Sequence, residues 1–148
     1  MLSYNQTLSE EKSFQDFQMK EISPIMKLNL RGKKREFLSA VGKSLNILLP
    51  TESNTSTQSE NLTALWLSPD EWMIYSNDIV EKNTNDYEVE MLLKNKISKL
   101  NLGSVTDVTD QFVLINLKGN KIYNLFQNGS PFNFNNFKSK KGAVAQTI

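Results

Sequence analysis

Residues 28–42 read LNLRGKKREFLSAVG, and residues 115–129 read INLKGNKIYNLFQNG. The two stretches align without a gap at an offset of 87 (115 − 28), with asparagine, a basic residue and glycine at matching places. Each begins with the apolar–polar alternation of a half-buried strand and continues with apolar residues at helical spacing. The repeat therefore predicts a duplicated α+β domain, in which residues 25–47 and 112–134 form equivalent strand–helix–strand units.

Glycines mark the same two places in each copy. Gly32 and Gly119 follow the predicted strands, where glycine allows the chain to turn sharply into a helix. Gly42 and Gly129 follow the predicted helices and are expected to stop them. Neither copy contains the GxGxxG or GxxxxGK[ST] pattern of a phosphate-binding loop. The repeat thus predicts a fold but no nucleotide site.

The stretch ALWLSPDEWMIYS, residues 64–76, contains both tryptophans of the chain. Two predicted strands, 62–68 and 71–76, flank a Pro-Asp pair, which favours a tight turn. In such a hairpin Trp66 and Trp72 can lie opposite each other. We expect one ring to pack in the core and the other to lie partly exposed, where a partner can cover it. The candidate partner contacts are Trp66, Asp70, Glu71 and Trp72.

The rest of the chain is predicted from the same kinds of pattern. A helix is expected over 87–100, strands over 104–110 and 142–148, and polar surface loops over 50–61 and 76–86. The buried face of the helix is predicted to comprise Val89, Leu92, Leu93, Ile97 and Leu100. Gly103 is expected to act as its stop signal.

Length and composition predict one domain preceded by an arm. Residues 1–24 are polar and are expected to order only on a partner or on the body of the protein. Residues 25–148 are expected to form a single domain, because neither polar loop is long enough to separate two cores.

The chain has 148 residues, a net charge of +1, no cysteine and no histidine. The missing cysteine excludes disulfides and thiolate chemistry, and the missing histidine removes the commonest general base and metal ligand. Carboxylate or lysine chemistry stays open. The near-neutral charge argues against a nucleic-acid surface. Because no signal peptide or membrane-spanning run is found, we expect a cytoplasmic protein.

Two pairs of carboxylates are the candidates for chemistry in this sequence. Asp70 and Glu71 lie at the predicted turn, where such side chains usually bind nearby backbone N–H groups. Asp107 and Asp110 lie in TDVTDQ, and Asp107 is the one weak candidate for a pocket. Because no histidine or metal-ligand partner accompanies either pair, structural roles are favoured. We therefore expect no catalytic, cofactor-binding or metal-binding residues in this chain.

Five short motifs are shared with a known family. They are LWLSPDEW (65–72), VTDVT (105–109), LKG (117–119), GSPF (129–132) and AQT (145–147). Over residues 25–148 the sequence thereby resembles the gamma subunit of heterotetrameric sarcosine oxidase. Ser68 replaces a glycine of the family pattern. Family members also continue with a further strand–helix pair where this chain stops, so it is expected to be short or a fragment, with a sheet edge or face left open.

The resemblance implies a fold, a partner set and a reaction. The family is similar in fold to the folate-binding domain of the glycine cleavage T-protein. Its partners are a large alpha subunit, a flavin-bearing beta subunit and a small zinc-binding delta subunit. The holoenzyme oxidatively demethylates sarcosine to glycine with FAD, FMN and NAD, and tetrahydrofolate accepts the one-carbon unit. The resemblance does not make the gamma subunit the carrier of the flavin chemistry.

Three hypotheses follow. The chain is an accessory subunit that assembles with alpha, beta and delta subunits in sarcosine catabolism. Alternatively, it is a stand-alone folate-binding or aminomethyltransferase-like protein of one-carbon metabolism, for which Asp107 would be the tempting carboxylate. The third hypothesis is an interaction domain without a connection to one-carbon metabolism.

Overall fold

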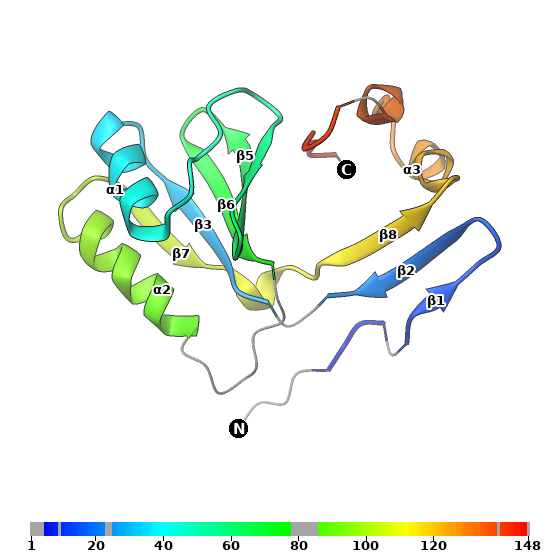
Figure 1. The fold of residues 1–148 in the computed structure, drawn as a ribbon, viewed down its shortest axis with the longest axis horizontal. Coiled ribbons are helices and arrows are strands. Elements are labelled where there is room, and N and C mark those ends of the chain that lie inside the picture. The colour runs from blue at the N-terminus through cyan, green and yellow to red at the C-terminus, as the bar shows by residue number, and fades with distance from the viewer. Residues whose placement is uncertain (1–4, 9, 23–24, 78–85, 139, 148) are drawn as a thin grey trace. The chain divides into compact units, whose positions relative to one another are not determined.

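The computed structural model describes residues 5–8, 10–22, 25–77, 86–138 and 140–147. The chain is an α+β protein, which confirms the predicted fold class, and it divides into two compact units (Figure 1). The major unit comprises Ile25–Phe112 and Gly142–Val144, and the minor unit comprises Met1–Pro24, Val113–Lys141 and Ala145–Ile148.

The major unit is built on a five-stranded sheet with the order β4-β5-β6-β3-β7, in which all neighbours are antiparallel. Its strands are β3 (Lys27–Arg31), β4 (Ser56–Gln58), β5 (Leu62–Ser68), β6 (Glu71–Ser76) and β7 (Ser104–Asp107). Helices α1 (Arg35–Leu45) and α2 (Asp86–Leu93) lie on one side of this sheet (Figure 1). A short 3₁₀ turn, Thr109–Gln111, follows β7.

The core of the major unit lies between the sheet and these helices. Alternation along β3 points Leu28 and Leu30 toward Phe37 and Val41 of α1, and all four side chains are fully buried. Each such side chain contributes roughly 1.5–3 kcal/mol through its removal from water. The segment predicted from the repeat is therefore also the segment that builds the core.

A π-helical turn, Lys94–Ser98, continues α2 and changes which side chains are buried. The turn is closed by a hydrogen bond that reaches five residues back, from Lys99 N to Lys94 O. Because this turn holds more residues than an α-helical turn, Leu102 packs on the core while Leu100 is 63% exposed. The prediction that Leu92 and Leu100 lie on the buried face was therefore wrong, since both are exposed.

The minor unit contains a three-stranded antiparallel sheet with the order β1-β2-β8. Its strands are β1 (Lys12–Ser13), β2 (Phe17–Glu21) and β8 (Ile115–Gly119). Helix α3 (Ile122–Gly129) and a 3₁₀ helix (Phe134–Lys138) follow β8. Two strands thus form within the polar N-terminal segment. The division into an arm, residues 1–24, and one domain, residues 25–148, stays a prediction.

The repeat is confirmed for two of its three elements. β3 and β8 each lead through a glycine into a helix, and the helices begin at Arg35 and Ile122, again 87 residues apart (122 − 35). The predicted strand after each helix was wrong. Residues 46–50 pair with no strand because Ile47 and Leu49 insert singly into the core, and the second copy continues with the 3₁₀ helix.

The glycines of the repeat have different physical roles. Gly119 has a φ of +142°, a conformation that other residues rarely adopt. Gly32 is needed for space, because an added Cβ would lie 2.4 Å from the Phe37 ring. Gly42 lies inside α1, so its expected role as a stop was wrong; Asn46, with a φ of +50°, ends that helix. Gly129 ends α3 as predicted.

Three further predictions need comment. The polar loop 50–61 contains β4, which its serine and threonine residues can form because the strand lies at the edge of the sheet. The predicted strand 142–148 was wrong, because only an isolated bridge joins Ala143 to Thr55. The predicted loop 76–86 falls mostly outside the described residues.

Candidate functional site

The β5–β6 hairpin places the two tryptophans directly opposite each other. Trp72 is 3% exposed, its Nε1 donates a hydrogen bond to Pro50 O at 2.8 Å, and its ring centroid lies 5.7 Å from that of Phe37. Trp66 is half-buried and packs against the edge of the same core. The expectation of one core ring and one partly exposed ring is confirmed. The use of Trp66 by a partner stays a prediction.

Glu71, at the hairpin tip, binds the end of β3, and Asp70 binds Ser68 and lies close to Lys33, which follows β3. Glu71 accepts hydrogen bonds from Asn29 Nδ2 at 2.8 Å and from Arg31 Nη2 at 2.7 Å. Asp70 accepts one from Ser68 Oγ at 2.9 Å, and Lys33 Nζ lies 3.5 Å from its carboxylate. These contacts hold the hairpin tip against the β3–α1 connection, so both carboxylates have structural roles.

The carboxyl of Asp70 predicts a pH dependence of stability. The hydrogen bond from Ser68 holds its pKa below the usual value of 3.8, with a further contribution from Lys33. A lowered pKa stabilises the folded state above 3.8, and this contribution is lost as the pH falls through the folded-state pKa. We expect Asp70→Asn to unfold at lower urea concentration than the wild type at about pH 7. The difference should shrink progressively as the pH falls below 3.8; a difference of unchanged size at low pH would contradict this origin.

Asp107 and Asp110 are not brought together as a reactive pair. Asp107 Oδ1 accepts a hydrogen bond from the Thr109 N–H at 2.8 Å, and this bond shapes the turn after β7. Asp110 lies exposed in the following 3₁₀ turn. The bond to Thr109 supports the structural interpretation of Asp107. Its assignment to a pocket stays a prediction.

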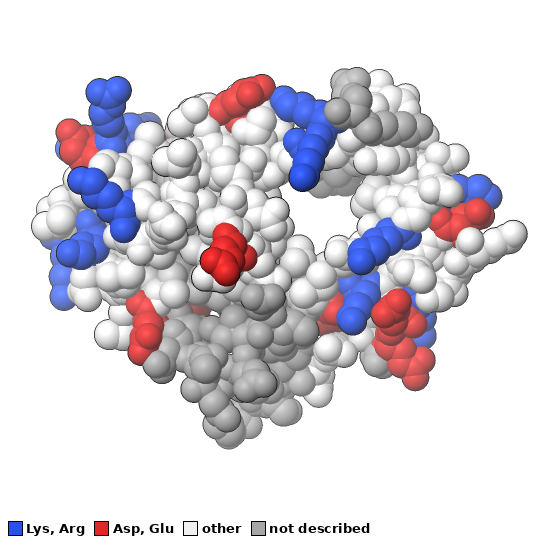
Figure 2. Space-filling view, in the orientation of Figure 1, with Lys and Arg blue, Asp and Glu red and all other residues white. Residues whose placement is uncertain are grey.

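The described residues contain neither a metal-ligand cluster nor a membrane-spanning helix. There, no three histidine, cysteine, aspartate or glutamate side chains are grouped so that they could hold a metal ion. No helix in the same ranges combines the length and apolarity needed to cross a membrane. Figure 2 shows acidic and basic side chains interspersed with uncharged surface on the face that it presents.

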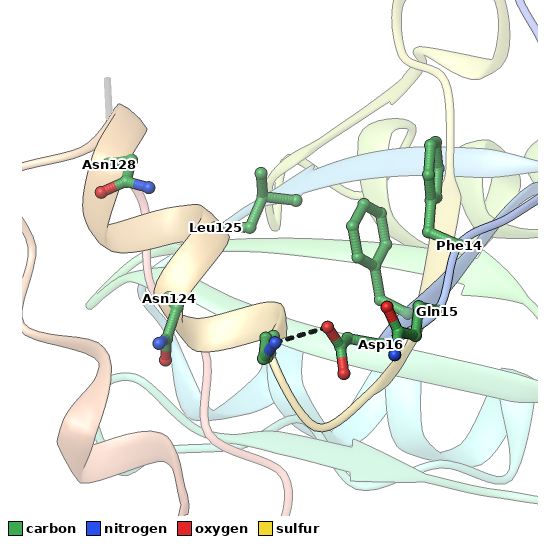
Figure 3. Close-up of a pocket in the computed structure, with 8 residues that line it drawn as sticks. Phe14, Gln15, Asp16, Asn124, Leu125 and Asn128 are labelled. Atoms are coloured by element: carbon green, nitrogen blue, oxygen red, sulfur yellow. Dashed lines mark hydrogen bonds and ion pairs between the residues drawn. The ribbon is translucent and has the colours of Figure 1, made fainter.

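A hollow of about 340 Å³ lies within the minor unit. One wall is the turn between β1 and β2, residues 14–17, where the rings of Phe14 and Phe17 stack with centroids 4.5 Å apart. The opposite wall comes from α3 and its start: Lys121, Asn124, Leu125 and Asn128. Figure 3 shows Leu125 directed from the helix toward the turn that carries Phe14. An ion pair of 2.5 Å between Lys121 Nζ and Asp16 Oδ2 closes one side.

Sequence reasoning missed this hollow because one wall lies in the segment predicted to be a polar arm. Two signals were available. Phe14 and Phe17 are large apolar residues in an otherwise polar stretch. The four residues of the second wall have the 0, 3, 4, 7 spacing of one helical face. Nothing local indicates that these two segments, about 105 residues apart in the Asp16–Lys121 pair, lie together.

No curated protein matches the sequence. Among solved structures, the chain is similar to one from the "Heterotetrameric Sarcosine Oxidase from Corynebacterium sp. U-96 in complex with pyrrole 2-carboxylate", with a TM-score of 0.75 and 16% identity over 93% of this chain and 68% of that chain. At this identity the likeness concerns the fold alone. The family described as "Sarcosine oxidase, gamma subunit family" matches residues 32–146. Because this match covers most of the sequence, the chain belongs to the sarcosine oxidase gamma subunit family.

Proposed function

We propose that this chain is the accessory gamma subunit of a heterotetrameric sarcosine oxidase. In this role it binds alpha, beta and delta subunits and supports the oxidative demethylation of sarcosine to glycine. The observation that carries the proposal is the family match over residues 32–146. The third hypothesis, an interaction domain without a connection to sarcosine, is disfavoured by the same match.

The surface of the described residues supports a role in assembly. Large apolar side chains are exposed to water in both units, which is unfavourable, and a partner subunit can cover them. They are Phe14, Leu48, Met91, Leu92, Leu100, Phe112, Val113, Ile115, Leu125 and Phe126.

Within this proposal the chain has no catalytic residue and no cofactor of its own. FAD, FMN, NAD and zinc are assigned to the other subunits, because this sequence offers neither a dinucleotide loop nor histidine or cysteine ligands. The stand-alone aminomethyltransferase is not favoured, because Asp107, its candidate pocket carboxylate, accepts a hydrogen bond from the Thr109 N–H.

The proposal is tested by co-expression with the alpha, beta and delta subunits of the same organism. The chain should elute with them in a stable complex on size-exclusion chromatography and should appear in stoichiometric amount. Elution of the chain alone, beside an active complex of the other three, would reject the proposal.

Trp66 supplies a sharper prediction for the same complex. Trp66→Ala should weaken assembly by about 2 kcal/mol or more, as expected of a half-exposed aromatic anchor. Its effect on unfolding should be much smaller than that of Trp72→Ala, because Trp66 lies at the edge of the core. Titration of the alpha–beta–delta assembly with each variant measures the first effect, and urea unfolding of the isolated chain measures the second. Unchanged affinity for the Trp66 variant would remove this residue from the interface.

A further inference from the structure

The hollow in the minor unit has the lining of a recognition site for a peptide segment. Three of its eight lining residues, Phe14, Phe17 and Leu125, are apolar; Phe14 is 53% and Leu125 44% exposed, so both side chains are available to a further apolar group. The volume of about 340 Å³ is enough for one or two large side chains. Gln15, Asn124 and Asn128 add amide groups that both donate and accept hydrogen bonds, as the peptide groups of an extended segment require.

The chain around the hollow has an uneven charge distribution. The sequence after Asp110 contains no acidic residue, and its five lysines are Lys118, Lys121, Lys138, Lys140 and Lys141. This segment therefore carries +5, while residues 1–24, which supply the other wall, carry −2 from two basic and four acidic residues. The minor unit as a whole is thus +3 (5 − 2), and the major unit is −2, from 10 basic and 12 acidic residues. Lys118, Lys140 and Lys141 are exposed. A surface of this sign attracts acidic partners and repels basic ones.

We propose that this hollow receives an apolar side chain from an extended, acidic segment of a partner subunit. The inference rests on the proposed function, since it names the chemistry of a partner within the same complex. The apolar side chain packs between Phe14 and Leu125, while the amides on both walls bind the main chain of the segment. Flanking carboxylates of the segment face the exposed lysines.

A protein segment fits the lining better than a nucleic acid does. Of the eight residues that line the hollow, one is basic, and this lysine is already paired with Asp16. A nucleic-acid site instead needs several lysines or arginines aligned for phosphates. The lysines outside the hollow therefore steer the partner, and the apolar side chains of Phe14, Phe17 and Leu125 retain it.

The experiment places a photo-crosslinking amino acid, p-benzoylphenylalanine, at position 125 of the chain within the co-expressed complex. After irradiation, mass spectrometry should identify a partner-subunit peptide in which acidic residues flank an apolar residue. The same probe at position 48 is the matched control, because Leu48 is 81% exposed and lies in the other unit. Crosslinks from position 125 to nucleic acid, to this chain alone or to a basic peptide would overturn the proposal.

Two substitutions test the affinity. Leu125→Asp places a carboxylate where the acidic segment binds and should weaken binding to the alpha–beta–delta assembly about 30-fold, the size of an anchor residue's contribution. Asn124→Ala, which removes only an exposed amide, should weaken it several-fold without affecting folding. Leu48→Asp should leave binding unchanged, and raising the salt concentration should weaken the wild-type complex.

The outcomes separate this inference from the proposed function. If the wild-type chain forms no complex, both are rejected. If it forms a complex whose affinity is indifferent to Leu125→Asp and Asn124→Ala, the gamma-subunit role stands and the hollow is not its docking site. If Leu125→Asp unfolds the chain, the affinity of the Asn124→Ala variant and the crosslink from position 125 decide whether the hollow is the docking site.

Discussion

Replacement of Trp72 by alanine should lower the free energy of unfolding of the isolated chain by about 3–5 kcal/mol. The ring is almost fully buried between the sheet and α1, beside Phe37, so alanine leaves a cavity in the best-packed part of the core. The substitution also removes the donor of the 2.8 Å hydrogen bond to Pro50 O. A buried acceptor without its donor adds to the cost of the cavity.

Urea unfolding followed by far-UV circular dichroism measures this effect. Trp72→Phe is the matched control, because it keeps most of the apolar volume and loses the hydrogen bond; its cost should be clearly smaller. Trp66→Ala provides a second comparison on the opposite strand of the same hairpin. Equal destabilisation by Trp72→Ala and Trp66→Ala would show that both rings are simply core, and the interface role of Trp66 would then fail.

The hairpin could be predicted from the sequence because its information is local. Short apolar runs, 64–67 and 72–75, on the two sides of Pro69–Asp70 specify two strands and a turn, and the structure has strands with the predicted bounds, 62–68 and 71–76. The start of α1 and α3 was also predictable, since a strand, a glycine and a helical spacing of apolar residues follow one another in both copies.

Other features depend on contacts between distant segments and were not predictable. The π-helical turn after α2 places Leu102 in the core in place of Leu100, a choice that only the shape of the core decides. Likewise, β2 was missed because its pairing partner, β8, lies about a hundred residues later and its own residues are mostly polar.

In the candidate site, too, local features were predictable from the sequence and contacts between distant segments were not. Local patterns identified Glu71 as a residue of the hairpin tip, but its hydrogen-bond partners Asn29 and Arg31 lie 42 and 40 residues away. These two residues belong to the repeat, where they appeared as ordinary strand positions. The matching order of elements in the two copies predicted the fold. The hydrogen bonds from Asn29 and Arg31 to Glu71 were not predictable, because these residues become neighbours only when β3 pairs with β6.

Substitution of Gly103 by alanine should also lower the free energy of unfolding strongly. The cause is a steric clash and not the loss of the helix stop that the sequence predicts. Gly103 was expected to stop the preceding helix, but Asn101, with a φ of +53°, has the left-handed conformation there. An added Cβ at Gly103 would lie 2.1 Å from Arg31 O and 2.9 Å from Cδ2 of Phe37. Because the first of these atoms belongs to the backbone of β3, relief requires the β3–β7 pairing to shift.

We expect Gly103→Ala to cost about 3 kcal/mol or more, at or beyond the upper end of usual overpacking effects. Gly42→Ala is the matched control, since Gly42 lies inside α1 and an added Cβ would meet nothing closer than Ile47 O at 3.5 Å. Alanine in a helix interior should instead stabilise the chain by about 0.5–1 kcal/mol. A lower urea midpoint for Gly103→Ala and a higher one for Gly42→Ala would show that the close approach of Gly103 to β3 excludes a side chain. Shifts of the same sign and size would show that the strand pairing tolerates a side chain there and that this close approach does not constrain the fold.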